Sequence, residues 1–296
     1  MSKLLNKHAG YVFLIPWLLG FLLLTLIPLV LSFYYSFTDF LMIDEPHFVG
    51  LDNYIRMFTT DFHFRDAVRV TLLYVFISVP LQIFASLVLA FILNKSVPGL
   101  AGIRAAFYVP SLLGGSVAVA ILWRQIFGTN GIFNVLLYSI GLEQFSGISW
   151  IADPRYALGS LVVLRVWQFG SPMIIFLAAI KQVPTSYLEA ATVDGANSFT
   201  RIVKIILPLI SPIILFNLVM QIISAFRVFT EAFVISGGDG GVMNSLLVYT
   251  IHIYNIGFRQ MRMGYASALS WFLVLMVAVF TVLAFIMTKK HVHYDE

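Results

Sequence analysis

A few polar and charged side chains stand at regular spacing inside long apolar runs of this sequence. Four of them, at steps of three, three and four, would share one broad helix face: Gln221, Ser224, Arg227 and Glu231. A second group lies midway along another run: Trp167, Gln168 and Ser171. Ionisable groups in apolar helices are rare and face a bundle interior or a water-filled cavity. The spacing therefore predicts a path that offers hydrogen bonds to a polar solute.

Other interpretations of these residues stay open. Arg227 and Glu231 also fit an ion pair at i, i+4 that touches no solute. Arg165 and Arg124 are weaker candidates for the path. Arg124 lies near the end of its apolar run, where a long side chain extends to the interface.

The sequence lacks the motifs of the common catalytic sites. It contains no Gly-Lys dipeptide and so no phosphate-binding P-loop, and neither G-x-S-x-G nor H-E-x-x-H occurs. It contains no cysteine, which excludes a thiol nucleophile, a disulfide and cysteine-ligated metal. The six histidines are scattered over predicted loops and ends. We expect no catalytic residue, no metal site and no cofactor bound by this chain.

Composition indicates a chain whose main solvent is lipid. Of 296 residues, 60% are hydrophobic and only 11% are charged. Soluble domains carry about a quarter charged residues. The net charge of +4 comes with lysines in short connections between apolar runs, and no basic stripe with interleaved aromatic residues is evident. This pattern favours membrane lipid as a partner and argues against nucleic acid.

Six apolar runs are each long enough to cross a bilayer core of about 30 Å, which takes about 20 helical residues. The predicted spans are 11–35, 68–93, 105–127, 157–180, 207–235 and 264–288. Their apolar character is continuous, whereas strands of a membrane barrel alternate in polarity. The first run is too long for a cleavable signal peptide, so we expect a mature helix there. The sequence predicts an all-α polytopic membrane protein with one six-helix domain over residues 11–288.

Basic residues predict the orientation of the chain. All seven lysines fall in connections on one side: the N-terminus (1–10), residues 94–104, the loop 181–206 and the C-terminus (289–296). The longer loops opposite carry arginines together with acidic and aromatic residues. Because positive residues are enriched on the cytoplasmic side, we expect both termini and the loop 181–206 in the cytoplasm.

That loop carries a spaced motif. Its defined positions are Glu189, Ala190, Ala191, Asp194, Gly195, Ile205, Leu207 and Pro208. They fit E-A-A, three residues, G, nine residues, I-x-L-P, a pattern that resembles the coupling loop of permease subunits in bacterial ATP-binding-cassette (ABC) importers. Three further stretches, 48–54, 237–240 and 263–268, resemble the carbohydrate-uptake branch of that family, the maltose and glycerol-phosphate type. Residues 237–240 stand where the family commonly has a G-G-G-P turn, and the expected proline is absent here.

The residues of the motif also predict its local structure. A short helix should start after Pro184, with Thr185 or Ser186 as its cap. Gly195 suits a tight turn that a residue with a Cβ would resist. Glu189 would lie near the helix N-terminus, where a carboxylate is favoured and could meet a basic group of a partner. Helical spacing resumes over residues 196–206, and Pro208 should mark the bend into the membrane.

The resemblance implies the type I importer permease fold, in which the coupling helix docks on a separate ATPase. It implies a second permease subunit, expected to be non-identical, two ATP-binding ATPase subunits that hold ATP and magnesium, and an extracytoplasmic solute-binding protein. The location would be a bacterial cytoplasmic membrane. The implied substrate is a di- or oligosaccharide, whose hydroxyl groups would meet the polar path while Trp167 stacks on a sugar ring.

Alternatives remain for function and for substrate. A transporter driven by an ion gradient would show internal repeats and intramembrane acids. Here Glu231 is the one acid inside a predicted span. A membrane enzyme would need an acid–base pair, which is not evident, and the loop 181–206 could be a plain amphipathic linker. Arg165 and Arg227 suit an anionic sugar, whereas Arg227 neutralised by Glu231 would suit a neutral one.

Overall fold

The fold is helical. The computed structural model describes residues 13–94, 99–145 and 147–288, and the predicted cytoplasmic termini lie outside these residues. Among the described residues no strand forms, and one isolated antiparallel bridge joins Thr38 to Phe48. The chain divides into two compact units: residues 1–61 with 253–274, and residues 62–252 with 275–296.

The described helices give four to six candidate spans. Four helices are long and apolar enough to cross a membrane: Phe13–Tyr35, Phe62–Ile92, Ser211–Ser236 and Met263–Thr288. Two bent pairs meet the same test: Leu100–Leu113 with Val117–Ser139, bent by 99°, and Ala157–Trp167 with Gly170–Gln182, bent by 43°. Counting each pair as one span gives six. The all-α polytopic class is confirmed, but the third and fourth spans are not the straight helices that the sequence predicts.

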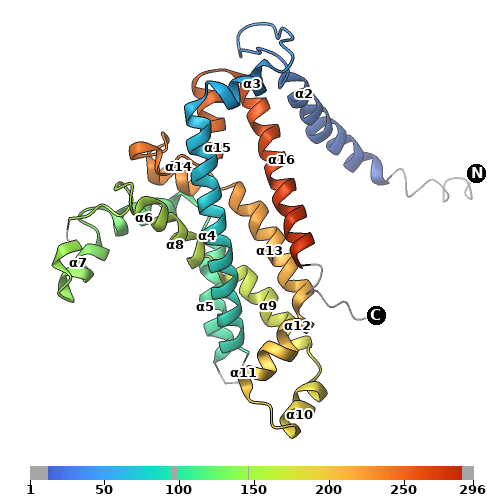
Figure 1. Cartoon of the computed structure of the whole chain (residues 1–296), viewed down its shortest axis with the longest axis vertical. Helices are drawn as coiled ribbons and strands as arrows, with labels where there is room; N and C mark the ends of the chain where they lie inside the picture. The colour runs from blue at the N-terminus through green and yellow to red at the C-terminus, as the bar shows by residue number, and fades with distance from the viewer. Residues whose placement is uncertain (1–12, 95–98, 146, 289–296) are drawn as a thin grey trace, which may run out of the picture. The chain divides into compact units, whose positions relative to one another are not determined.

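The second unit is built around one long helix, α4 (Figure 1). Its other main helices include α5 (Leu100–Leu113), α6 (Val117–Phe127), α8 (Ala157–Trp167), α9 (Gly170–Gln182), α13 (Ser211–Phe226) and α14 (Thr230–Ser236). Helix α4 (Phe62–Ile92) packs against α8, α9 and α13, while α5 packs on α9 and α6 on α14. Apolar burial between these helices forms the core of the unit.

Helices α5 and α9 approach closely at Gly170. A Cβ on this glycine would lie 2.4 Å from Ser111 Oγ and 2.6 Å from the Phe107 carbonyl oxygen. No real Cβ makes such contacts, so only glycine permits this approach. Small residues at helix crossings are how membrane helices gain close van der Waals packing.

The break between α5 and α6 has a local cause. Residues 114 and 115 are both glycine, and the Ser116 side chain accepts a hydrogen bond from Val119 N at 3.3 Å, which caps α6. A serine N-cap and two residues of poor helix propensity stop one helix and start the next. The single span predicted over 105–127 is therefore two helices.

The segment between α6 and α8 folds around a buried asparagine. Asn134, in α7 (Ile132–Ser139), donates to the carbonyl oxygens of Thr129 and Ile148, both at 2.7 Å, and accepts from Trp150 Nε1 at 2.6 Å. Farther along, the exposed Arg155 binds Asp153 at 2.7 Å (Nη2–Oδ2). The hydrogen bonds from Arg155 hold the pKa of Asp153 at about 2.

The first unit joins two of the stretches that the sequence analysis singled out. Asn53, in α3 (Asp52–Thr59), donates to the carbonyl oxygens of Ser36 (3.0 Å) and Thr38 (2.8 Å). Gly264, at the start of α16 (Met263–Thr288), donates its N–H to Phe40 O at 2.9 Å. A Cβ on Gly264 would lie 2.1 Å from Thr38 O, so this position requires glycine. Within this unit, the stretches 48–54 and 263–268 therefore have a structural role: both bind the backbone of residues 36–40.

Candidate functional site

The fourth span is broken in the middle of the second unit. Helix α8 ends at Trp167, Gln168 leaves the helical conformation (φ −82°, ψ 31°), and α9 begins at Gly170. The two carbonyl groups at the break receive side-chain donors from α4: Gln82 Nε2 binds Gln168 O and Ser86 Oγ binds Phe169 O, both at 3.1 Å. Irregular backbone at membrane depth is tolerated only where it is buried in protein or lines a water-filled cavity.

The fifth span is broken as well. Helix α13 ends at Phe226, Arg227 follows with φ −96° and ψ 9°, and α14 begins at Thr230. The Val228 carbonyl in the gap accepts a hydrogen bond from the Thr250 hydroxyl. The helix on which Gln221, Ser224, Arg227 and Glu231 were predicted to share one face is thus interrupted after Phe226, so only Gln221 and Ser224 lie on α13. No ion pair within 4 Å between Arg227 and Glu231 is found in the described part of the chain.

Arg165 joins these two breaks. Its Nε donates to Gln82 Oε1 at 2.8 Å, its Nη1 to Ser224 Oγ at 3.1 Å and its Nη2 to Gln221 Oε1 at 2.7 Å, with a longer contact from Nη2 to Gln221 O at 3.4 Å. Gln82 is 2% exposed and Arg165 is 9% exposed. We call these four residues the Arg165 network. One guanidinium thus connects α4, α8 and α13.

Gln82 belongs to a row of buried polar residues on α4, in which Ser78 Oγ has no hydrogen-bond partner among the described residues. Tyr74, Ser78, Gln82 and Ser86 follow one another at steps of four and are each at most 2% exposed. Side chains at this spacing share one helix face. Residues 70–93 contain no charged side chain, and the predicted path therefore includes none of them. Uncharged polar residues at constant helical spacing in an apolar run were the signal that the sequence analysis missed.

The predicted path residues divide between this network and the surface of the unit. Gln221 and Ser224 belong to the network, and the Gln168 side chain packs where a Cβ on Gly114 would be, 2.2 Å from its Cδ. Trp167, Ser171 and Arg227 are exposed, while Glu231 is partly buried. The Trp167 ring lies 6.0 Å from that of Trp123.

Arg124 does not extend freely to an interface, since its Nη1 binds Val234 O in α14 at 3.3 Å. Arg165, which the sequence analysis ranked as a weaker candidate for the path, is the residue with the most contacts in it. Its role as a hub depends on partners 56 to 83 positions away in the chain. Spacing within one run does not reveal such partners.

The predicted cytoplasmic loop forms two helices joined by a glycine turn. Helix α10 (Thr185–Val193) starts after Pro184 as predicted, but neither Thr185 nor Ser186 caps it. Gly195 adopts φ +77°, with Ala196 N bonded to Ala191 O at 2.9 Å and Gly195 N to Thr192 O at 3.1 Å. These two bonds form a Schellman motif, which favours glycine because its turn residue is left-handed. The prediction for Gly195 is confirmed.

Two further expectations for the loop need correction. Glu189 is the fifth residue of α10, so it lies beyond the first turn, where the helix dipole acts most strongly. Residues 196–206 do not form one regular helix: α11 (Ser198–Arg201), capped by Asn197, passes into a π-helical segment (Ile202–Ile206). Wider turns of this kind are frequent at functional sites. The short α12 (Leu207–Leu209), which contains Pro208, then ends at Ile210, where α13 begins.

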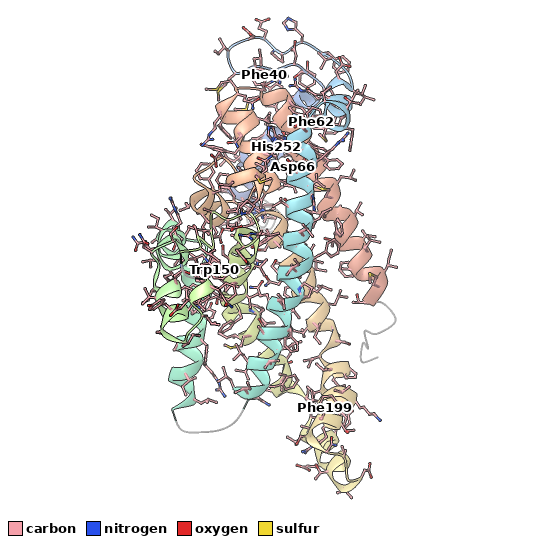
Figure 2. The ribbon with its side chains drawn as sticks, turned by 60° about the vertical axis from the view of Figure 1, so that its left-hand side comes forward. Phe40, Phe62, Asp66, Trp150, Phe199 and His252 are labelled. Atoms are coloured by element: carbon pink, nitrogen blue, oxygen red, sulfur yellow. The ribbon has the colours of Figure 1, made fainter. Side chains whose placement is uncertain are left out.

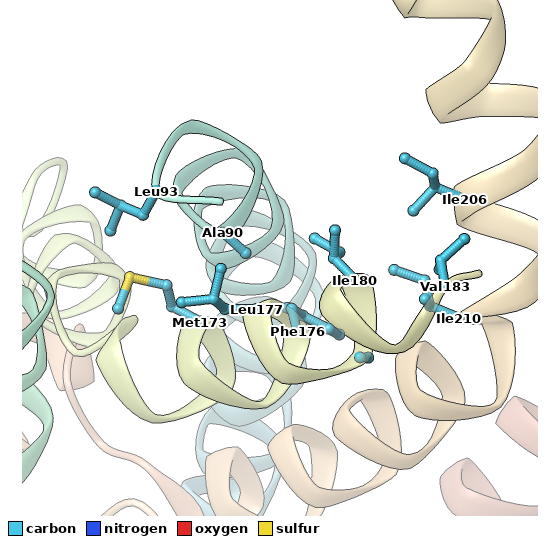
Figure 3. Packing of buried hydrophobic residues seen from close by; sticks show 10 residues of the cluster. Ala90, Leu93, Met173, Phe176, Leu177, Ile180, Val183, Ile206 and Ile210 are labelled. Carbon is cyan, nitrogen blue, oxygen red and sulfur yellow. The ribbon is translucent and has the colours of Figure 1, made fainter. Parts of the chain in front are cut away.

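Both ends of this loop are fixed in one hydrophobic cluster (Figure 3). Val183 leads into α10, Ile206 and Ile210 follow α11, and all three are at most 8% exposed. They pack with residues of α4 and α9: Ala90, Leu93, Met173, Phe176, Leu177, Ala179 and Ile180. Because interiors are packed as densely as crystals, a displacement of the loop is transmitted to these helices.

The loop itself has an exposed apolar surface. Tyr187 is 54%, Val193 88% and Phe199 73% exposed. Phe199 and Phe62, at the start of α4, lie at opposite ends of the second unit (Figure 2). Arg201 braces the turn by donating from Nη1 to Thr192 Oγ1 at 3.0 Å. A braced turn with apolar side chains outward is suited to contact a partner.

Comparison with known proteins agrees with this arrangement. Residues 62–292 match the family model described as "Binding-protein-dependent transport system inner membrane component". The chain is 47% identical to the probable ABC transporter permease protein YesP of Bacillus subtilis, over 98% of this chain and 93% of the relative. It is 32% identical to the trehalose/maltose transport system permease protein MalF of Thermococcus litoralis, over 95% and 94%.

A solved structure shares the fold. A chain of the bacterial alginate ABC transporter, in complex with an alginate pentasaccharide-bound periplasmic protein, superposes with a TM-score of 0.81 at 22% identity and covers 98% of this chain and 97% of that one. Family, relatives and fold thus agree with the resemblance that the coupling motif suggested. The chain belongs to the family of binding-protein-dependent inner membrane transport components, as a permease of the sugar ABC transporters.

Proposed function

We propose that this permease forms part of the translocation path for a di- or oligosaccharide and couples that path to a separate ATPase through the loop 181–206. The observation that carries the proposal is the construction of this loop. Its helix–turn–helix is braced internally, is fixed at both ends in the core of α4 and α9, and exposes apolar side chains. A plain linker needs none of these features.

Coupling residues follow from this construction. Ala190 and Ala191 keep one side of α10 slim, and Glu189 is exposed, with no hydrogen bond or ion pair to another described residue. Asp194 and Gly195 form the turn, while Ile205, Leu207 and Pro208 connect α11 to the fifth span. We propose that an ATPase surface encloses α10 and that its movement shifts α4 and α9.

The sugar path is proposed along the broken fourth and fifth spans. Trp167 and Ser171 on one side and Ser224 and Arg227 on the other are exposed in this subunit. Gln168, Gln221 and Glu231 lie close by in sequence. An exposed indole offers a stacking surface, and hydroxyl, amide and guanidinium groups match the hydroxyl groups of a sugar. These residues would complete a path together with a second permease.

The partners proposed are those that the family resemblance implies. They are a second, non-identical permease, two ATPase subunits that hold ATP and magnesium, and an extracytoplasmic solute-binding protein. The alginate transporter was solved with such a periplasmic protein. Both termini are placed in the cytoplasm by the lysine pattern. A gradient-driven carrier is disfavoured, since a braced cytoplasmic loop has no role in it.

Photo-crosslinking tests the coupling proposal. A photoreactive phenylalanine at position 199 should capture a protein that carries a P-loop, identified by mass spectrometry after irradiation of intact membranes. Phe62 is 75% exposed and lies at the opposite end of the unit, so the same label there is the matched control. Capture of the ATPase from position 199 alone is the expected result. Equal capture from both positions, or capture of no ATPase, would contradict the proposal.

A further inference from the structure

Arg165 holds a buried positive charge without a negative partner. All its hydrogen bonds end on uncharged oxygens: two side-chain amide oxygens, one hydroxyl and one backbone carbonyl. No ion pair of Arg165 is found in the part of the chain that the structure describes. Burial of an ion is costly, and neutral hydrogen bonds do not remove its net charge. Such a cation can bind an anionic group of a ligand.

The side of the guanidinium that carries Nη1 is the one nearest the surface of the subunit. Nη1 donates to Ser224, which is exposed, whereas Nε and Nη2 end on the more buried Gln82 and Gln221. The second hydrogen of Nη1 has no acceptor among the described residues. A ligand that displaces the Ser224 hydroxyl would reach two donors of one nitrogen. Arginine binds carboxylates strongly through donors in a fixed geometry.

A second cation lies directly after α13, the helix that carries Ser224. Arg227 follows Ser224 by three positions, is exposed, and has no ion pair in the described part of the chain. Glu231, the acid nearest in sequence, is on α14, beyond the break, and forms no ion pair with either arginine among the described residues, although its charge and that of Arg165 both act on the buried Tyr74. Two arginines against this one acid leave an excess of positive charge beside the broken spans. A neutral sugar needs hydrogen bonds there but no net charge.

We infer that Arg165, assisted by Arg227, selects acidic oligosaccharides. The guanidinium of Arg165 binds a sugar carboxylate beside Ser224. The inference rests on the proposed function and specifies its substrate class. Arg165 is then a specificity-determining residue. The neutral partners Gln82 and Gln221 hold its guanidinium in place without neutralising it, which an acidic partner would do. Hydrogen bonds between a charged donor and a charged acceptor are stronger than those between neutral groups.

The test uses the assembled transporter in proteoliposomes with its own binding protein and ATPase. The probes are trisaccharides of galacturonate, glucuronate and mannuronate, each as the free acid and as the methyl ester, which keeps the backbone and removes the charge. Uptake is compared for the wild type, Arg165→Lys and Arg165→Gln. Arg155→Gln is the control, because Arg155 is an exposed arginine paired to Asp153 outside the spans.

The wild type should take up at least one of the acids. Arg165→Gln should lower the uptake of that acid about tenfold relative to any ester that the wild type carries, the effect of about 1.4 kcal/mol. Arg165→Lys, which keeps the charge, should retain several-fold more acid uptake than Arg165→Gln. Arg155→Gln should leave the ratio of acid uptake to ester uptake unchanged. This ratio separates selection from folding, because a lower amount of folded protein reduces the uptake of acid and ester equally.

Three results would overturn the inference. One is a wild type that carries neutral trisaccharides but none of the acids. Another is an Arg165→Gln variant that keeps the acid uptake of the wild type. The third is an equal loss for the lysine and glutamine variants, which would make Arg165 a purely structural hub. A wild type that carries no oligosaccharide with ATP present would refute the proposed function itself, a distinct outcome.

Discussion

The coupling loop and the Arg165 network lie in the same unit and are built in opposite ways. The loop is one continuous stretch, residues 181–206, and its turn is closed by hydrogen bonds between near neighbours. The network is assembled from three helices whose residues are 56 to 83 positions apart. One region exposes apolar side chains, and the other buries polar groups. Substitutions in the two regions should therefore have different effects on folding and on function.

The buried region should respond most strongly to a change in volume. Gly170→Val would place a side chain against the backbone of α5, 2.6 Å from Phe107 O and 2.8 Å from Tyr108 Cα. We expect the unfolding free energy to fall by about 3 kcal/mol or more, because the helices must separate. Thermal unfolding in detergent measures this. Gly159→Val is the control, since a Cβ there meets nothing within 4 Å; similar losses for both would show that α5 and α9 are not closely packed.

The exposed loop should instead lose its function while the fold persists. Gly195 has nothing within 4 Å of its Cβ position, but its φ of +77° is costly for a residue with a side chain. Gly195→Asp should leave the spans inserted and weaken ATPase association about tenfold, the equivalent of about 1.4 kcal/mol. Transport and solute-stimulated ATP hydrolysis should fall together, because in the proposed role the loop transmits force without touching sugar.

Co-purification of the ATPase with the Gly195→Asp permease is the measurement, alongside uptake in vesicles. Gly195→Asn provides a graded control, since asparagine tolerates the left-handed region and carries no charge. Its effect should be smaller than that of aspartate. Normal association with normal uptake in the aspartate variant would reduce the loop to a linker.

A carboxylate placed inside the network should separate charge from packing. Gln82→Glu keeps the shape of the side chain and gives Arg165 an acid where Gln82 Oε1 now accepts at 2.8 Å. It should neutralise the guanidinium and lower the uptake of acidic sugars about tenfold relative to their esters. The lost hydrogen bond from Gln82 Nε2 to Gln168 O lowers the stability of the fold but leaves this ratio unchanged. Unchanged acid uptake would mean that the free charge of Arg165 is not used.

The smallest effect concerns Arg227 and Glu231. Because no ion pair joins them in the described structure, the stability losses of Arg227→Ala and Glu231→Ala should add within about 0.5 kcal/mol in the double variant. Arg227→Ala should still impair sugar uptake, since the residue is exposed beside Ser224. A double variant more stable than either single one would establish the pair that the sequence alone also allowed.

What the sequence could predict follows the same division between the two regions. The helix after Pro184 and the left-handed Gly195 are local, so motif spacing and turn chemistry were sufficient for them. The breaks at Gln168 and Arg227 are not local. They persist because distant side chains such as Gln82, Ser86 and Thr250 satisfy the freed carbonyl groups. An apolar run read by itself gives an unbroken helix, and Arg165 then has no visible partner.

The central claim, that this chain works with an ATPase and not with an ion gradient, has one direct measurement. Proteoliposomes that hold the purified transporter are loaded with ATP and magnesium, supplied with binding protein and labelled oligosaccharide outside, and kept free of ion gradients. The account predicts accumulation under these conditions, and none when ATP is replaced by an imposed proton or sodium gradient. Accumulation driven by the gradient without ATP would contradict it.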